Sequence, residues 1–128
     1  MKVDQTAPNL TTPAEELKDL IVECIQDKKG EGIISIDLRH IPEAVCDYFI
    51  VCHTTTDTQV KGIARHIKEE IKEKTGEYPY QTEGFNNLEW VLIDYVHVVA
   101  HVFKRDIRTY YDLEELWSDG IIEEYETL

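Results

Sequence analysis

The run Tyr48-Phe49-Ile50-Val51-Cys52 constrains the fold of this chain more than any other segment. Successive side chains of a strand point to opposite faces of a sheet, so a strand with this run must be covered on both sides. Helices packed on both faces of a sheet provide such cover. We therefore expect this segment to be a central strand between helical layers.

One amphipathic helix is predicted before this strand in the sequence, and a second one after it. The first begins at Thr12-Pro13-Ala14-Glu15, which supplies an N-cap, a proline at the first helical position and a glutamate at the third. Gly30 and Gly32 end it. Its apolar stripe, at helical spacing, consists of Leu17, Leu20, Ile21, Cys24 and Ile25.

The second helix follows a capping box at Thr56-Asp57-Thr58-Gln59 and ends near Gly76. Its apolar stripe is Val60, Ile63, Ala64, Ile67 and Ile71. Charges of both signs occupy its other side, a pattern typical of a solvated face, and we assign that side no function. These residues are Lys61, Arg65, Lys68, Glu69, Lys72 and Glu73.

The remaining segments predict strands and one short helix. A β-branched strand covers Ile33 to Leu38, and beyond the second helix a period of two predicts a β-meander. The meander consists of Tyr78 to Thr82, a turn over 83–87, Leu88 to Asp94, and Val98 to Phe103. Asp112, with Glu115 three residues later and Leu116 and Trp117 after it, predicts the N-cap of a short helix that closes the domain. The fold class is therefore α/β, with a mixed sheet of about five strands and helices packed on it.

The length of 128 residues, with 42% hydrophobic side chains, predicts one domain over residues 12–118. Residues 1–11 lack periodicity and are expected to be a flexible leader, and residues 119–128 an acidic, frayed tail. The formal net charge of −13 opposes approach to phosphate backbones and anionic membranes, and favours a basic partner. Three cysteines without C-x-x-C spacing, no long apolar stretch and no signal peptide predict a cytoplasmic location.

Sequence signals for catalysis or metal binding are weak. Phosphate-binding glycine motifs and a nucleophile elbow are absent from the sequence. On one strand His97 and His101 would lie roughly 13 Å apart, too far to share a metal ion. Cys52 and His53 point to opposite faces of a strand, which separates nucleophile from base. The carboxylate pairs that can be drawn are Glu83 with Glu89, and Asp94 with Asp106.

Large aromatic side chains are concentrated in the second half of the chain. In the predicted strand Trp90 shares a face with Leu92 and Asp94, whereas Tyr95 shares the other face with Val91 and Ile93. The strand cannot bury both sets on one side, so some aromatic surface is expected to remain for a partner. The aromatic residues of this stretch are Phe85, Trp90, Tyr95, Phe103, Tyr110, Tyr111 and Trp117.

Several of these pieces, taken in order, resemble the ribosomal silencing factor family, also called the Iojap family. The resemblance spans roughly residues 15 to 118. Its pieces are Asp37-Leu38-Arg39, Asp47 to Val51, Gln59 with Ile63-Ala64, Glu83-Gly84, Trp90 to Tyr95, Val98 to Phe103, and Arg108 with Tyr110 to Trp117.

The resemblance implies a nucleotidyltransferase-like fold that serves as a binding module. It implies binding to the large ribosomal subunit through the fourteenth large-subunit protein, which would block joining of the small subunit and repress translation when nutrients are short. It also implies docking anchors at Trp90 and Tyr95. Further motif positions near them are Asp94, Glu83, Gly84, Arg108 and Tyr111.

One motif departs from the family's usual Asp-Tyr-Gly-Asp. This chain has Asp94-Tyr95-Val96-His97, so valine replaces a flexible glycine and histidine replaces an acidic residue. The geometry of the turn and the charge of the docking edge are expected to differ accordingly.

We expect no enzymatic activity, cofactor or metal, because no Asp-x-Asp clamp for Mg²⁺ lies on a predicted strand. Direct sequence-specific contacts to nucleic acid and contacts to membranes are not expected either. Two alternatives stay open: a small nucleotide-binding or nucleotidyltransferase-like enzyme, and an adaptor for large-subunit assembly. Exposed aromatic side chains could also pair two unbound copies into a homodimer.

Overall fold

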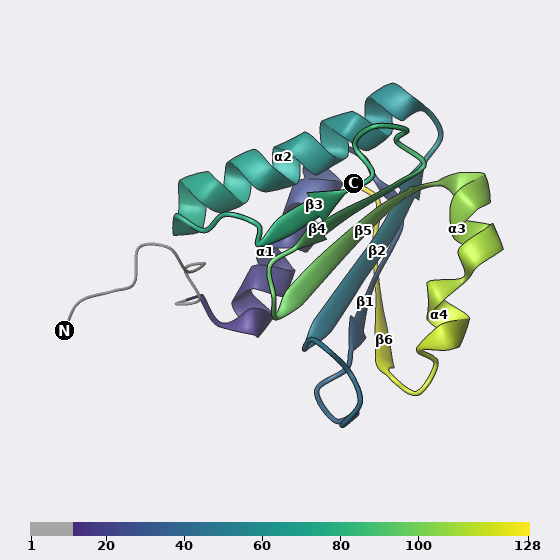
Figure 1. Cartoon of the computed structure of the whole chain (residues 1–128). Helices are drawn as coiled ribbons and strands as arrows, with labels where there is room; N and C mark the ends of the chain where they lie inside the picture. The colour runs from purple at the N-terminus through teal and green to yellow at the C-terminus, as the bar shows by residue number, and fades with distance from the viewer. Residues whose placement is uncertain (1–11) are drawn as a thin grey trace.

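The computed structural model describes residues 12–128, in which a sheet lies between two layers of helices (Figure 1). The expected leader, 1–11, lies outside the described residues. The helices are α1 (Ala14–Asp27), α2 (Asp57–Thr75), α3 (Arg105–Tyr111) and α4 (Leu113–Leu116). The strands are β1 (Glu31–Asp37), β2 (Tyr48–Thr54), β3 (Gln81–Glu83), β4 (Trp90–Asp94), β5 (Val98–Lys104) and β6 (Ile121–Tyr125).

The sheet is mixed, and its strand order is β3-β4-β5-β2-β1-β6. β2 runs parallel to β5, and the other neighbouring strands are antiparallel. The α/β class is confirmed, with six strands in place of the expected five. No helix among residues 12–128 combines the length and apolar character needed to cross a bilayer.

The expectation for the apolar run of β2 is confirmed, because its side chains enter two separate cores. Tyr48, Ile50 and Cys52 pack with apolar side chains of α1 and α2. Phe49 and Val51 pack on the other face, where α3 and α4 lie. A strand that is apolar on both faces therefore supports both helical layers.

The predicted ends of α2 are confirmed. The Gln59 backbone N–H donates to Thr56 Oγ1 at 3.1 Å, and the Thr56 N–H donates to Gln59 Oε1 at 3.2 Å, which completes the capping box. Gly76 ends the helix with a φ of 79°, a left-handed conformation that glycine adopts without steric cost.

Local signals misplaced two boundaries and missed one helix. α1 begins at Ala14, and Pro13 occupies the N-cap position, so Thr12 does not cap the helix. The strand expected from Tyr78 is only the three residues of β3. α3 was not predicted, because it buries no residue fully and has no apolar stripe. Asp112 has a φ of 47° and makes no capping hydrogen bond with its side chain.

The acidic tail is ordered, contrary to the expectation that it frays. Residues 121–125 form β6, which pairs antiparallel with β1 at the edge of the sheet. The Tyr125 hydroxyl lies 3.0 Å from Ser35 Oγ and accepts a 3.5 Å hydrogen bond from Lys18 Nζ. Thr127 Oγ1 donates to the Gly30 carbonyl at 2.8 Å. These side-chain bonds hold a strand whose own apolar residues, Ile121 and Ile122, stay exposed.

Candidate functional site

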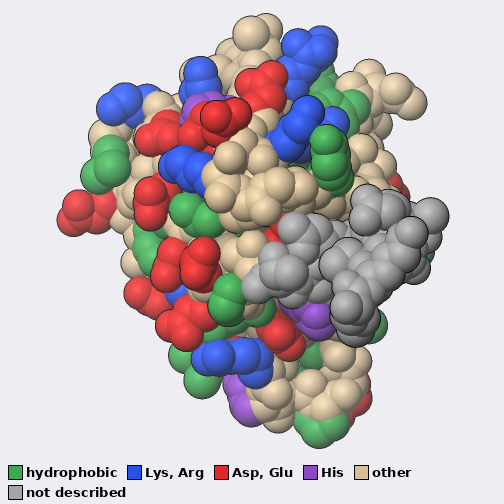
Figure 2. Space-filling view, turned by 90° about the vertical axis from the view of Figure 1, so that its left-hand side faces the viewer, with side chains coloured by type: hydrophobic (Ala, Val, Ile, Leu, Met, Phe, Trp, Pro, Cys, Tyr) green, Lys and Arg blue, Asp and Glu red, His purple; other side chains and the backbone are tan. Residues whose placement is uncertain are grey.

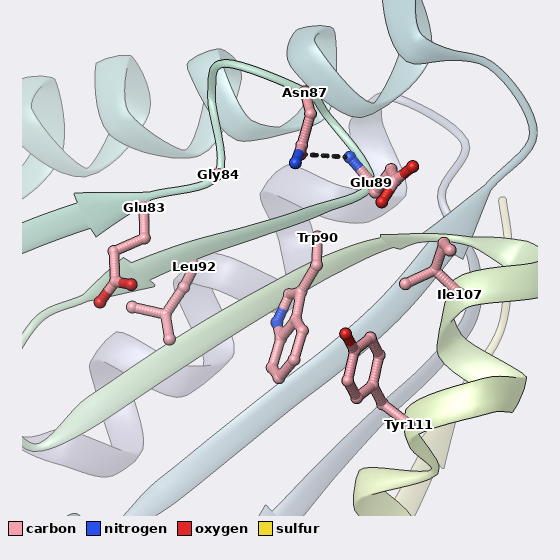
Figure 3. Close-up of a pocket in the computed structure, with 8 residues that line it drawn as sticks. All are labelled: Glu83, Gly84, Asn87, Glu89, Trp90, Leu92, Ile107 and Tyr111. Atoms are coloured by element: carbon pink, nitrogen blue, oxygen red, sulfur yellow. Dashed lines mark hydrogen bonds between the residues drawn. The ribbon is translucent and has the colours of Figure 1, made fainter.

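A groove of about 270 Å³ lies on the outer part of the sheet face that α3 and α4 cover only partly (Figure 3). Trp90 and Leu92 of β4 point to this face and are half-buried, whereas Val91 and Ile93 point into the opposite core. The groove is lined by Glu83, Gly84, Asn87, Glu89, Trp90, Leu92, Ile107 and Tyr111.

Trp90 is held in place by rings on neighbouring elements. Its ring centroid lies 4.9 Å from that of Phe103, which stands opposite it on β5, and 4.8 Å from that of Tyr111 on α3. Tyr111 is 50% exposed, so this aromatic surface is open to solvent on one side. Such a half-exposed aromatic cluster is typical of a protein-binding surface.

The buried side chain of His101 fixes the orientation of the Trp90 indole. The Trp90 Nε1–H donates to His101 Nδ1 at 3.1 Å, so the imidazole proton is assigned to Nε2. Burial lowers the pKa of His101 to about 3, and the ring is neutral at physiological pH. It also packs edge-on against Phe49, with centroids 4.6 Å apart. His101 is therefore a positioning residue for Trp90.

Carboxylates stand at the rim of the groove. The side chains of Glu83 on β3 and Glu89 before β4 are both exposed, so the pair considered for acid and base chemistry lines one surface. The Glu89 backbone N–H donates to Asn87 Oδ1 at 3.2 Å, which shapes the loop (Figure 3). Exposed carboxylates beside aromatic rings suit a basic protein partner better than a phosphate group.

Gly84 is required by close packing in this loop. Its φ is 90°, and an added Cβ would overlap the carbonyl oxygen of Trp90. The expected motif positions Glu83, Gly84, Trp90 and Tyr111 thus come together in one groove. Leu92, Ile107 and Asn87 were missed, and the alternation of β4 could have indicated Leu92, which shares the face of Trp90.

Tyr95 requires a correction. Its side chain is 1% exposed and lies in the core under α1 and α2, where burial raises its pKa far above the usual range. The alternation of the strand had placed it with Val91 and Ile93, and all three are buried. A docking anchor must reach its partner, so we exclude the Tyr95 side chain from the candidate surface.

Asp94 and Arg108 have local structural roles. Asp94 Oδ1 accepts a 2.7 Å hydrogen bond from the Val96 N–H and so closes the turn before β5. It stands at the opposite end of β4 from Trp90, roughly 13 Å away along the strand, and so is remote from Asp106 at the start of α3.

Arg108 joins α3 to α4, β1 and β2. Its guanidinium donates to Glu114 Oε2 at 3.2 Å, to the Gly32 carbonyl at 2.6 Å and to His53 Nδ1 at 2.9 Å. Burial and the neighbouring Arg108 charge lower the pKa of His53. Arg108 therefore anchors α3 to its neighbours and does not line the groove.

The part of the chain that the structure describes holds no cluster of metal-binding side chains. Within residues 12–128, no three His, Cys, Asp or Glu side chains gather where they could hold an ion. His97 is exposed in the turn before β5, while His101 is buried under Trp90.

Comparisons with known proteins identify relatives over nearly the whole chain. Residues 11–127 match the family model described as "Ribosomal silencing factor during starvation". The ribosomal silencing factor RsfS of Bacillus subtilis is 46% identical over 94 residues, which cover 73% of this chain and 78% of that protein. A crystal structure of a Chromobacterium violaceum protein superposes with a TM-score of 0.78 at 33% identity, covering 84% of this chain and 88% of the other. For a Bacillus halodurans crystal structure the TM-score is 0.71 at 39% identity, with 80% and 94% covered.

The family match extends from before α1 to beyond β6, and the relatives are similar to this chain in both sequence and fold. The chain therefore belongs to the ribosomal silencing factor family.

Proposed function

We propose that the chain represses translation by binding the large ribosomal subunit, through its fourteenth large-subunit protein, and blocking the small subunit from joining. The observation that carries this proposal is the groove around Trp90, where exposed aromatic rings meet the carboxylates of Glu83 and Glu89. Ribosomal proteins are typically basic, so a partner of this class would find charge complementarity there. The bacterial relatives are named ribosomal silencing factors, and these names support a ribosomal partner.

The action we propose is steric and needs no chemical step. A module of 14.9 kDa bound to the joining face would occupy space that the small subunit requires. The residues that line the groove include no lysine, arginine or histidine, so no cationic side chain there would hold a phosphate group. Docking would take place in the cytoplasm, where ribosomal subunits join.

Co-sedimentation tests the proposal directly. Purified protein is mixed with separated large or small subunits, centrifuged through a sucrose gradient, and the missing subunit is then added. We expect migration with the large subunit alone and fewer whole ribosomes. Equal formation of whole ribosomes with and without bound protein would refute the blocking mechanism.

Trp90→Ala tests the site itself. If Trp90 is a hot spot, its loss costs about 2 kcal/mol or more, which weakens binding by roughly 30-fold. Tyr95→Phe is the matched control, because the Tyr95 hydroxyl makes no hydrogen bond to the described residues and the ring is buried. Circular dichroism verifies the fold of each variant. Unchanged binding by folded Trp90→Ala would move the site elsewhere.

A further inference from the structure

The charged residues of α2 are mixed in sign along the sequence, but on the helix surface four basic side chains align in one row. Lys61, Arg65, Lys68 and Lys72 are spaced four, three and four residues apart. At 3.6 residues per turn this spacing keeps them within about 60° of one another around the helix axis, in a row roughly 16 Å long. We call these four residues the basic row. In a chain of net charge −13 it is a local reversal of sign.

The basic row is not neutralised by the carboxylates around it. Within residues 12–128 none of its four side chains forms an ion pair, whereas Lys74 on the same helix pairs with Glu70 at 3.6 Å. Lys61, Arg65 and Lys72 are exposed and Lys68 is half-buried. In Figure 2 the upper part of the view, where α2 lies, holds most of the visible basic side chains, and the part below is mainly acidic.

Aromatic rings accompany the basic row. Lys68 Nζ lies 5.2 Å from the centroid of the Phe85 ring, and Lys72 Nζ lies 5.3 Å from that of Tyr78. Tyr78 is 60% exposed. Cations that follow a backbone, with aromatic rings beside them, are the combination that binds RNA strands without reading their sequence.

One loop connects the basic row with the groove. Phe85 touches Lys68, while its neighbour Gly84 and the nearby Asn87 line the groove around Trp90. Because α2 packs on the opposite face of the sheet from the groove, a partner must extend around the β3 edge to contact both the groove and the basic row. The row repels a basic protein, and the groove's carboxylates repel phosphate, so the two surfaces suit partners of opposite charge.

We propose that the basic row binds phosphates of large-subunit ribosomal RNA next to the protein held in the groove. This inference rests on the proposed function and adds a second, sequence-independent contact to it. The overall negative charge keeps the chain off free RNA, and the basic row engages RNA once the groove has placed it there.

The test uses the full chain with Lys61, Arg65 and Lys72 replaced together by Gln. Affinity for purified large subunits is measured over a series of salt concentrations. Each phosphate contact on RNA contributes roughly 0.7 to 0.9 to the slope of log K against log[salt]. The triple variant is expected to bind more weakly at low salt, with a slope shallower by about 2.

The matched control replaces Lys28, Lys29 and Lys74 by Gln. These lysines are exposed and lie outside the basic row, and the change in net charge is the same. The control is expected to keep the parent's slope. Equal slopes for both triple variants and the parent would overturn the proposal. Weaker binding of the first variant with an unchanged slope would also overturn it, because the row would then contact protein.

Deproteinised large-subunit ribosomal RNA separates this inference from the proposed function. If the parent chain fails to bind intact large subunits, the proposed function is wrong. The basic row is then tested by measuring the binding of each variant to the RNA alone at low salt. There the basic-row variant should bind more weakly than the matched control. Equal RNA binding by the two variants would refute an RNA contact. The same two variants are also compared on phosphatidylserine vesicles. A difference seen on the vesicles and not on RNA would refute the RNA contact as well.

Discussion

Val96 has a backbone conformation that its side chain disfavours. Its φ is 76°, in the left-handed region, and the Asp94 carboxylate accepts a hydrogen bond from its N–H. The resemblance to the motif Asp-Tyr-Gly-Asp predicts glycine at this position. The turn therefore keeps the glycine conformation with a β-branched residue in it, which costs on the order of 1 to 2 kcal/mol.

Val96→Gly should raise the free energy of unfolding. Relief of the left-handed strain outweighs the ~0.5 to 1 kcal/mol that glycine's backbone entropy costs, for a net gain of about 1 kcal/mol. Urea denaturation measures the change. Val45→Gly is the control, because Val45 is 85% exposed and has no positive φ, and it should lower stability slightly. A loss of stability in Val96→Gly would show that the turn is not strained.

His101 links folding to pH. The pKa of His101 in the folded chain is about 3, below the ordinary value of 6.5. Below pH 6.5 the unfolded chain therefore binds a proton at His101 that the folded chain does not bind. Stability from the neutral imidazole is therefore full above pH 6.5 and declines as the pH falls toward 3. In His101→Gln this contribution is absent, and the Gln carbonyl can still accept from the Trp90 indole.

Between pH 6.5 and 4 the parent should lose up to about 1.4 kcal/mol more per pH unit than His101→Gln. Chemical denaturation at a series of pH values gives the two curves, and carboxylates common to both chains cancel in the difference. Parallel curves would mean that His101 is accessible to protons in the folded chain.

At the scale of the elements, β6 depends on side chains far away in the sequence. Tyr125 reaches Ser35 on β1 and Lys18 on α1, so one hydroxyl joins three elements. The outer positions of β6 are glutamates and exposed isoleucines, which give the strand little apolar burial of its own. Its attachment should therefore be sensitive to this contact.

Tyr125→Phe should lower the free energy of unfolding by about 1 kcal/mol, because Ser35 and Lys18 lose a partner in a partly buried site. Hydrogen exchange of residues 121–125 should accelerate more than that of β2. Tyr110→Phe is the control, since Tyr110 is 79% exposed. If residues 121–125 of the parent already exchange as fast as an unfolded peptide, the tail is frayed, as the sequence alone predicted.

Elements with strong local signals were predictable, and those defined by distant contacts were not. The capping box and apolar stripe indicated α2, and the apolar run indicated β2. β6 was missed because its sequence, Ile-Ile-Glu-Glu-Tyr, becomes a strand only beside β1, nearly ninety residues earlier. At the site, alternation along β4 separated Trp90 from Tyr95 correctly, whereas the resemblance alone suggested that both were anchors.

At the scale of the whole molecule, the two cores enclose all three cysteines. Cys24 and Cys52 lie in the core under α1 and α2, and Cys46 lies in the core on the other face. Burial raises the pKa of each thiol to about 12. Thiolates are the reactive form, so the folded chain should resist both labelling and disulfide formation.

We expect a thiol-specific reagent at pH 8 to label Cys52 only as fast as the whole domain opens. Mass spectrometry of labelled fragments distinguishes the three sites, and Cys46, 8% exposed at the end of a loop, should react first. Stability should be the same with and without reducing agent. Labelling of Cys52 faster than global unfolding would reveal a local opening of the central strand.

The pairing of β6 with β1 also determines when this sheet can be finished. During synthesis the chain emerges from its N-terminus, and β1 is made long before its outer neighbour. Contacts between segments so far apart are slow to form. A nascent chain therefore exposes one edge of β1 until residues 121–125 have left the exit tunnel, and the sheet gains its last strand only then.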